Sequence, residues 1–448
     1  MNTTIKLFSA SAFIFMSSYA AAEIIAFENV NVIPMSQETV LLNQRVVVDN
    51  DKIAAIEPMS TIEHIKPNRR IDCQHKYLMP GFTDAHYHPR GATTTKDFEF
   101  FYKLLLANGV TTVVSMGEDF GQDAIAIKNN ANKKDVLAPI YFAAGPMYHH
   151  DNLKTPKDAL DIVDFHKKRG YDFIKVHDNF PKETYLALLS EAEKAGVPVV
   201  GHGQRDLPLE FTLRLTLIAH MEEVVMVFSD DKNFIVTEIS DQKAQEIARQ
   251  VKNSGVYISP TLTVVAKFHD YRNDGRLDAL KQRPENQYLS KAEYKNYTTD
   301  GEEYRREIFS SPKGIATVDA LIKNTQVLTQ AFYNAGVPLL IGSDNIGLQI
   351  TGFALHDEME AMNKAGVPAF SVLNGATQLA ARYLKRQAVA GTISEGKNAE
   401  FVLLSKNPLD DIKNTRDVQG VMIKGHWLDK KILDRFLKDV ATARKQEK

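Results

Sequence analysis

The chain has 448 residues, of which 44% are hydrophobic and 25% are charged, and its formal net charge at pH 7 is −2. This length suits a barrel of roughly 250 residues or more together with a smaller domain, and the balanced charge is typical of a globular protein with a large core. No basic cluster interleaved with aromatic residues is present, which argues against nucleic acid as a partner. The single cysteine, Cys73, excludes an intrachain disulfide.

The first 22 residues have the pattern of a secretory signal peptide. Lys6 precedes an apolar run over 7–16, and alanines occupy positions 20–22 before Glu23. The apolar run is short for a spanning helix of about 20 residues, so cleavage after Ala22 is favoured over an uncleaved membrane anchor. We therefore expect a periplasmic or secreted protein that is not held in a membrane once the signal is removed.

The two ends of the remaining chain have similar sequence patterns. Short β-rich runs broken by Asn and Asp occupy 25–58, and similar runs return over 391–428. Each end alone would be marginally stable, so we expect both to combine in one small β-sandwich domain. Its parts are 23–79 and 387–448, the second including a terminal helix.

The middle of the chain, 80–386, alternates apolar runs with helical segments, which predicts an α/β fold with a parallel sheet. Eight strands fit a closed (β/α)8 TIM barrel. A polar stretch over 266–313 interrupts the alternation and is expected to be a surface helical insertion near the mouth. The first predicted strand ends at His88; the others are Val110–Ser115, Ile140–Gly145, Phe173–His177, Val197–His202, Leu217–Met221, Val256–Pro260 and Pro338–Ser343.

Metal-ligating residue types recur where these strands end. His86 and His88 are two residues apart, so on a strand both side chains project to one face. His202 and His220 end the fifth and sixth predicted strands, and Asp344 follows the eighth. Any one of these residues alone would be better explained as a hydrogen-bonded structural residue, but their joint recurrence at one end of a barrel predicts a metal site.

Lys175 lies within the apolar run 171–176. A lysine in a buried strand is costly unless its charge is removed or paired. Desolvation lowers the pKa of such an amine, and the neutral amine can combine with carbon dioxide to give a carbamate whose two oxygens bridge two cations. The alternative of similar weight is a lysine that reaches solvent or pairs with a nearby acid such as Asp172 or Asp178.

Taken together, these motifs resemble the amidohydrolase superfamily, in its imidazolonepropionase-like and Xaa-Pro dipeptidase-like branch. The resemblance extends over 26–428 and rests on the run Pro80–His88, Lys175, His202, His220 and the run Gly342–Asp344. Shorter supporting matches occur at Asn374–Thr377, Gly391–Ile393 and Gly396–Val402.

The resemblance implies two divalent metal ions and a bridging hydroxide, with zinc expected first and manganese, iron or cobalt remaining open. Two such ions activate a shared water and polarise a carbonyl. Asp344 would take the proton of the attacking hydroxide and pass it to the leaving amine. The ligands implied are His86, His88 and Asp344 for the more buried ion, His202 and His220 for the more exposed ion, and a carboxylated Lys175 as the bridge.

Two departures from the deaminase pattern favour hydrolysis by two metals. Deaminases of this superfamily are associated with a single metal and no lysine on the fourth strand, whereas this chain has Lys175. They also place a glutamate three positions after the fifth-strand histidine, where this chain has Arg205. Glu223 lies three positions after His220 instead, and is best explained as a loop acid or a partner of a ligand.

Residues that contact substrate are less clearly indicated. His177 follows Lys175 by two positions and either touches substrate or orients a ligand. His149 lies in a loop at the mouth, and Arg205 can pair a carboxylate or a neighbouring acid such as Asp206 or Glu210. Tyr257 is a further candidate, although packing in the core also explains it.

The sequence therefore predicts a metal-dependent amidohydrolase that acts on an amide bond in a small molecule or short peptide, such as a dipeptide, an Xaa-Pro substrate or an N-acyl amino acid. A lactonase or phosphotriesterase on the same site is the alternative within enzymes. A catalytically silent metal-binding protein is the alternative outside them, and a homo-oligomer is compatible with the sequence.

Overall fold

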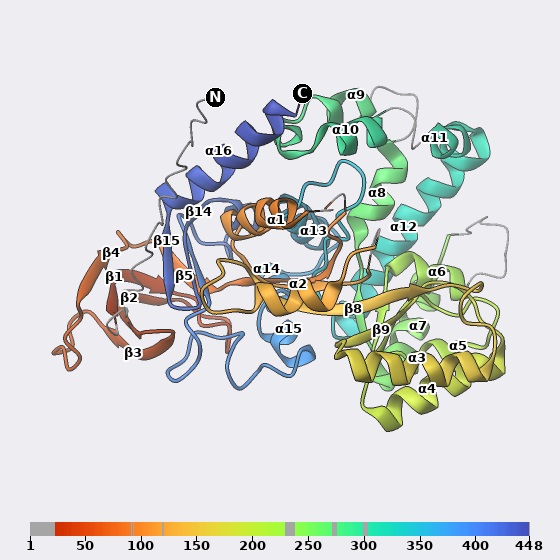
Figure 1. Cartoon of the computed structure of the whole chain (residues 1–448), viewed down its shortest axis with the longest axis horizontal. Coiled ribbons are helices and arrows are strands. Elements are labelled where there is room, and N and C mark those ends of the chain that lie inside the picture. The colour runs from red at the N-terminus through yellow and green to blue at the C-terminus, as the bar shows by residue number, and fades with distance from the viewer. Residues whose placement is uncertain are drawn as a thin grey trace, which may run out of the picture.

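The computed structural model describes residues 23–90, 92, 94–118, 121–228, 238–270, 276–298 and 303–447. The predicted signal peptide, 1–22, lies outside the described residues. Within the described ranges, no helix is long and apolar enough to cross a membrane. Figure 1 shows a sheet at one end of the molecule and a larger α/β unit beside it.

The smaller unit is one mixed sheet of eight strands built from both ends of the chain, in the order β15-β14-β13-β5-β1-β2-β3 with β4 also paired to β1. The C-terminal strand β13 runs antiparallel to β5 and places Leu403 opposite Leu78. Phe27 packs edge-to-face against Phe401 and Trp427, so the two ends also share a core. The strands are β1 (Ile24–Val32), β2 (Leu41–Asp49), β3 (Lys52–Pro58), β4 (Arg69–Asp72), β5 (Tyr77–Pro80), β13 (Phe401–Leu404), β14 (Val418–Ile423) and β15 (His426–Asp429).

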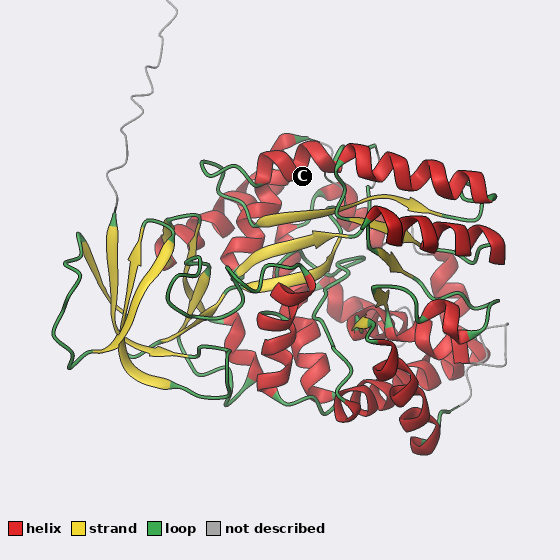
Figure 2. Cartoon of the chain, turned by 90° about the horizontal axis from the view of Figure 1, so that it is seen from below, coloured by secondary structure: helices red, strands yellow, loops and turns green. Residues whose placement is uncertain are grey.

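The larger unit is a barrel of parallel strands, as predicted. Seven strands follow one another around it in chain order, from β6 to β12. Helices follow the strands on the outside, and Figure 2 shows them around the sheet. The strands are β6 (Phe82–Tyr87), β7 (Val110–Ser115), β8 (Ile140–Tyr148), β9 (Phe173–Val176), β10 (Val199–Gly201), β11 (Leu217–Ala219) and β12 (Tyr257–Ser259).

The eighth predicted strand is present as an extended segment that has no regular ladder. Leu340 donates its N–H to the carbonyl of Ile258 on β12 (2.8 Å), and Ala85 on β6 donates to the carbonyl of Ile341 (2.9 Å). The segment thus closes the barrel between its last and first strands. Its Gly342 leaves no room for a side chain, since a Cβ atom there would lie 2.5 Å from the Cβ of His86.

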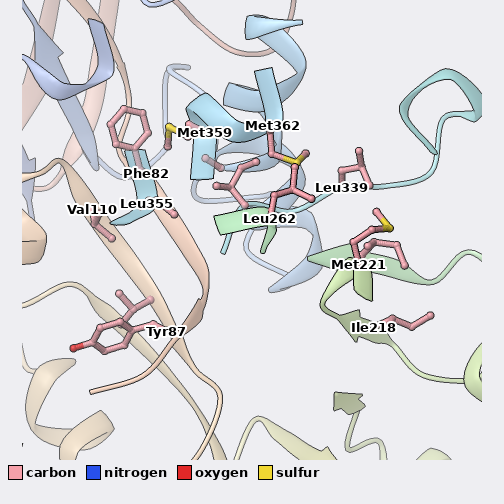
Figure 3. Packing of buried hydrophobic residues seen from close by; sticks show 14 of the residues in the cluster. Phe82, Tyr87, Val110, Ile218, Met221, Leu262, Leu339, Leu355, Met359 and Met362 are labelled. Atoms are coloured by element: carbon pink, nitrogen blue, oxygen red, sulfur yellow. The ribbon is translucent and has the colours of Figure 1, made fainter. Parts of the chain in front are cut away.

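Side chains alternate between the barrel interior and the helices outside. Phe173 belongs to the interior cluster, whereas Ile174 and Val176 pack against the surrounding helices. Lys175 therefore shares the interior face with Phe173. The outer layer includes Leu355 and Met359 from helix α13, which Figure 3 shows.

Four helices that cover the barrel, α1, α3, α4 and α7, begin and end within three residues of the bounds that the sequence predicts. Those bounds are Phe98–Ala107, Asp158–Arg169, Lys182–Ala195 and Asp241–Asn253, and α4 has them unchanged. These helices end in Asn or Gly, and three of the four C-caps are left-handed glycines. The helices of this part are α1 (Thr95–Ala107), α2 (Ala124–Ala131), α3 (Pro156–Arg169), α4 (Lys182–Ala195), α5 (Leu209–Thr212), α6 (Met221–Phe228) and α7 (Asp241–Ser254).

The predicted insertion after β12 is helical, and a long helix leads from it back to the barrel. It comprises α8 (Leu262–Asp270), α9 (Arg276–Lys281), the 3-10 helix η1 (Pro284–Tyr288), α10 (Lys291–Thr298) and α11 (Glu303–Ser310), followed by α12 (Pro312–Ala335). The rest of the helices are α13 (Phe353–Lys364), α14 (Ala369–Gly375), α15 (Gln378–Tyr383), the 3-10 helix η3 (Ile412–Arg416) and the terminal α16 (Lys430–Gln446).

Candidate metal centre

His86, His88 and Asp344 form a buried cluster at the C-terminal end of the barrel. The Nε2 atoms of the two histidines are 3.2 Å apart, and Asp344 Oδ1 lies 3.3 Å from His88 Nε2 and 3.7 Å from His86 Nε2. Two ligands of a tetrahedral ion at about 2.0–2.1 Å are separated by about 3.3 Å. The donor atoms therefore fit one divalent ion of the zinc type.

His202 and His220 present a second pair of imidazoles to the same space. The Nδ1 of His202 lies 3.2 Å from Glu223 Oε1, and the Nδ1 of His220 lies 2.7 Å from the hydroxyl of Thr261. That hydroxyl donates its own proton to the carbonyl of Pro260, so it accepts from His220. In both rings the proton therefore lies on Nδ1, and the unprotonated Nε2 is available to bind a metal ion.

Backbone strain contributes to the convergence of these ligands. Leu217 and Ala219 on β11 point into the barrel, so regular alternation would turn His220 outward. His220 instead adopts a left-handed conformation with φ of 72°. Asp344 is also left-handed, with φ of 38°. Such strain costs on the order of 1–3 kcal/mol per residue and is typical of functional sites.

Lys175 is the sixth predicted ligand and is 1% exposed. It lines the same cavity as the other five ligands, and its charge contributes to lowering the pKa of both His86 and His220. Asp172, one of the acids offered as an alternative partner of Lys175, binds Lys128 (2.7 Å) and accepts the N–H of Ala143.

Burial is the main influence on the protonation of the site. It lowers the pKa of His86 and of His220 well below the usual range, and the positive charge of neighbouring Lys175 adds to the effect. Burial also lowers the pKa of His177 to about 3. The imidazoles of these three residues are therefore neutral at physiological pH, as metal ligation requires.

Two adjacent carboxyl groups on α6 have opposite protonation. Burial raises the pKa of Glu222 well above its usual range, and the negative charge of Glu223 adds to this. Burial would raise the pKa of Glu223 as well, but the charges and hydrogen bonds of His202 and Arg205 hold it well below that range. The sequence left two explanations for Glu223, a loop acid or a partner of a ligand. The first is wrong, because Glu223 lies on helix α6, and its contact with His202 agrees with the second.

The metal-binding residues form one end of a cavity of about 900 Å³. Of the four predicted substrate contacts, His177 and Arg205 line it. Arg205 is held by Glu223, with its Nε 3.1 Å from Oε2 and a second, short contact from its Nη2 to Oε1. Its charge is therefore largely neutralised within the protein.

Tyr257 and His149 lie elsewhere. The Tyr257 ring packs 5.2 Å from that of Tyr383 in the interior cluster of the barrel. His149 lies at the rim, where its Nδ1 is 3.5 Å from Asp178 Oδ2 and its ring is 4.7 Å from that of His177.

Asp178 organises a group of histidines at this rim. It accepts hydrogen bonds from the backbone N–H (3.1 Å) and the Nδ1 (2.7 Å) of His150. Burial would raise the pKa of Asp178, but these hydrogen bonds bring it to about 2. Asp178 is therefore ionised, and the groups that it contacts are the histidines around it.

Arg90 is a cavity residue that the sequence interpretation missed. It lies two residues after His88 and lines the cavity. Among the described residues, none accepts a hydrogen bond from its buried Nε. The signal was available in the sequence, since a cation directly after a metal-binding strand end is placed beside the ligands.

Comparisons with known proteins agree with this architecture. A sequence model described as "Amidohydrolase family" matches residues 77–428. Among curated proteins, the dihydroorotase of Pediococcus pentosaceus is 21% identical over 239 residues, which cover 48% of this chain and 54% of that protein. The chain thus spans about half the length of this relative.

Solved structures match over more of the chain. A Xaa-Pro dipeptidase with bound methionine in the active site is 18% identical, with a TM-score of 0.67 over 91% of this chain and 100% of that one. A bottromycin amidohydrolase is 20% identical, with a TM-score of 0.71 over 94% of this chain and 90% of that one. At these identities the similarity demonstrates a shared fold.

Proposed function

Since the chain belongs to the amidohydrolase family, we propose that it is a hydrolase of carbon–nitrogen bonds that cleaves an amide bond in a small molecule or short peptide with the help of two divalent ions, zinc being the first expectation. The proposed place of action, the periplasm or the exterior, rests on the sequence of residues 1–22. The observation that supports the chemistry is the convergence of six strand-end ligands on one cavity.

Bound cations at this site would lower the pKa of water and polarise a carbonyl group. His86, His88 and Asp344 would hold one ion, and His202 and His220 the other, with a carboxylated Lys175 between them. Asp344 lies against the rings of His86, His88 and His220, so its carboxylate is oriented toward the reacting atoms. It accepts the proton of the attacking water and delivers it to the leaving amine.

Arg90 supports a substrate that carries a carboxylate. Arg90 lines the cavity together with the metal ligands, whereas the charge of Arg205 is taken up by Glu223. A dipeptide, an Xaa-Pro substrate or an N-acyl amino acid places a carboxylate near the amide bond. In the Arg90→Met variant we expect a higher KM for such substrates and a smaller change in kcat, because the residue binds without taking part in proton transfer.

Metal content tests the two-metal proposal directly. Elemental analysis of the purified protein should give close to two ions per chain, and Lys175→Ala should lower this number. Added short carboxylates should partly restore both metal and activity. The matched control is Lys128→Ala, which removes a lysine that pairs with Asp172 away from the cavity. One metal per chain, unchanged in Lys175→Ala, would refute the bridge.

The Asp344→Asn variant separates an enzyme from a metal-binding protein. Turnover should fall by several orders of magnitude while the circular dichroism spectrum stays that of the parent. Parallel assays with lactones and phosphotriesters test the alternative activities. Turnover of these esters alone, with no amide cleaved, would replace the proposed reaction by ester hydrolysis on the same site.

A further inference from the structure

The cavity has a second end whose chemistry differs from that of the metal centre. Away from the ligands, its lining comes from α6, α8, α11 and α12, where apolar side chains lie among the polar Glu307, Ser311, Lys313 and Thr317. The insertion predicted to lie on the surface therefore forms a wall of the cavity. The apolar residues on which the following steps depend are Val264, Phe268, Ile308, Phe309, Val318 and Leu321.

This wall is built from packed helices. The rings of Phe268 on α8 and Phe309 on α11 stack with centroids 4.7 Å apart. Gly314 on α12 allows α11 to approach closely, because a Cβ atom there would lie 2.0 Å from the carbonyl oxygen of Ile308. Val318 and Leu321 of α12 belong to the same wall and are themselves buried.

Ile308 is not fully covered by the protein itself. It lines the cavity together with Phe309 and is 54% exposed. An apolar surface beside a polar catalytic end is the usual arrangement of a small-molecule site, in which few polar groups fix the orientation and apolar contacts supply affinity. The cavity volume of about 900 Å³ also exceeds the needs of a small dipeptide and lies in the upper range for drug-sized ligands.

We infer that the substrate carries a bulky apolar group, alkyl or aryl, that lies against the helices α8, α11 and α12 while its amide bond lies at the metal ligands. The inference rests on the proposed function, since it names the substrate class of the same site. Small, wholly polar dipeptides are accordingly poor substrates. Affinity should rise about fourfold for each buried methylene, which corresponds to ~0.8 kcal/mol.

Binding of carboxylic acids to the metal-loaded protein tests the inference without relying on turnover. The probes are straight-chain acids from acetate to decanoate and a phenylalkanoate series, measured by titration calorimetry. Affinity should increase with chain length until the wall is covered. A steeper gain in the alkyl series indicates an acyl chain as the natural group, and a steeper gain in the phenyl series indicates an aromatic one.

The Ile308→Ser variant should flatten this dependence on chain length. Because Ile308 is already 54% exposed, the substitution leaves the packing of the core intact. The matched control is Ile62→Ser, which makes the same change at a residue that is 81% exposed on the smaller unit. This control should keep the slope of the parent protein. Equal affinity for all chain lengths, or an unchanged slope in Ile308→Ser, would overturn the inference.

The outcome also separates this inference from the proposed reaction. N-acyl glycines of increasing chain length are assayed for hydrolysis beside the binding series. If long acids bind and no amide is cleaved, the proposed function is wrong and the apolar subsite stands. If amides are cleaved at the same kcat/KM whatever the chain length, the reaction stands and the subsite is wrong.

Discussion

Glu223 offers a sharp test of how the protein prepares the exposed half of the metal site. Its carboxylate is almost fully buried and contacts both the Nδ1 of His202 and the guanidinium of Arg205. In the Glu223→Gln variant the shape is preserved, but an NH2 donor replaces one of the two oxygens that face His202 and Arg205, and the negative charge that pairs with Arg205 and favours the Nδ1–H tautomer of His202 is lost. Removing such a partner of a metal ligand typically costs 10–100-fold in metal affinity.

The structure also sets a range for the stability that Glu223→Gln should lose. Breaking a fully buried ion pair costs about 3–5 kcal/mol. The Arg205 side chain is 32% exposed, so water takes up part of the lost interaction. We therefore expect a loss of about 1–3 kcal/mol, seen as a lower Tm. Because the pKa of Glu223 is depressed in the folded protein, its contribution is present above pH 4.5 and is lost as the pH falls below that value.

The assay is a chelator titration of the metal-loaded protein, with metal content followed by elemental analysis and Tm measured at pH 7. Glu222→Gln is the matched control, because burial raises the pKa of that neighbouring carboxyl and keeps it protonated, so the amide is close to a neutral replacement. If Glu223→Gln kept its metals as well as Glu222→Gln does, His202 would not depend on this carboxylate and the reasoning would be refuted.

Further predictions concern the segment that closes the barrel, the dependence of stability on pH and the contact between the two units. Gly342→Ala should cost about 1–3 kcal/mol and most of the activity, because the new methyl group would overlap His86; Tm and turnover check this. Burial raises the pKa of Glu358 to about 7, against 4.5 when unfolded. The stability it contributes therefore falls as the pH rises from 4.5 to 7, and Glu358→Gln should make this fall in Tm smaller. Arg386→Met should lower Tm by leaving the largely buried Glu400 unpaired.

Much of the fold could be predicted because the barrel repeats one pattern. Apolar runs followed by helical segments with glycine C-caps determine the strands and helices to within a few residues, as in α4. The extended segment that closes the barrel between β12 and β6 shows the limit of this prediction. Its apolar residues predict a strand, but its hydrogen bonds to Ile258 and Ala85 are too irregular for a ladder.

Within the site, the ligands could be predicted because strand ends meet at one mouth, whereas their partners could not. His220 lies close to Asp344 because its backbone is left-handed, and the alternation of residues along a strand does not predict that conformation. The sequence offers Arg205 a substrate carboxylate or a neighbouring acid such as Asp206 or Glu210 as its partner. Only the folded position of α6 shows that the acid it binds is Glu223. The insertion was expected on the surface near the mouth because its sequence is polar, and its polar sequence gave no sign that apolar side chains of α8 and α11 line the cavity.

The pairing of β13 with β5 has a consequence for how the chain reaches this structure. The strands of the N-terminal end emerge first during synthesis and β5 can pair with β1, but its other edge stays open until Leu403 can meet Leu78. Contacts so distant in sequence are slow to form, and an unpaired strand edge is prone to aggregation until then. The last tenth of the polypeptide therefore acts as the closing step of assembly. Shortening the chain before β13 should yield insoluble protein even though every proposed metal ligand is still present.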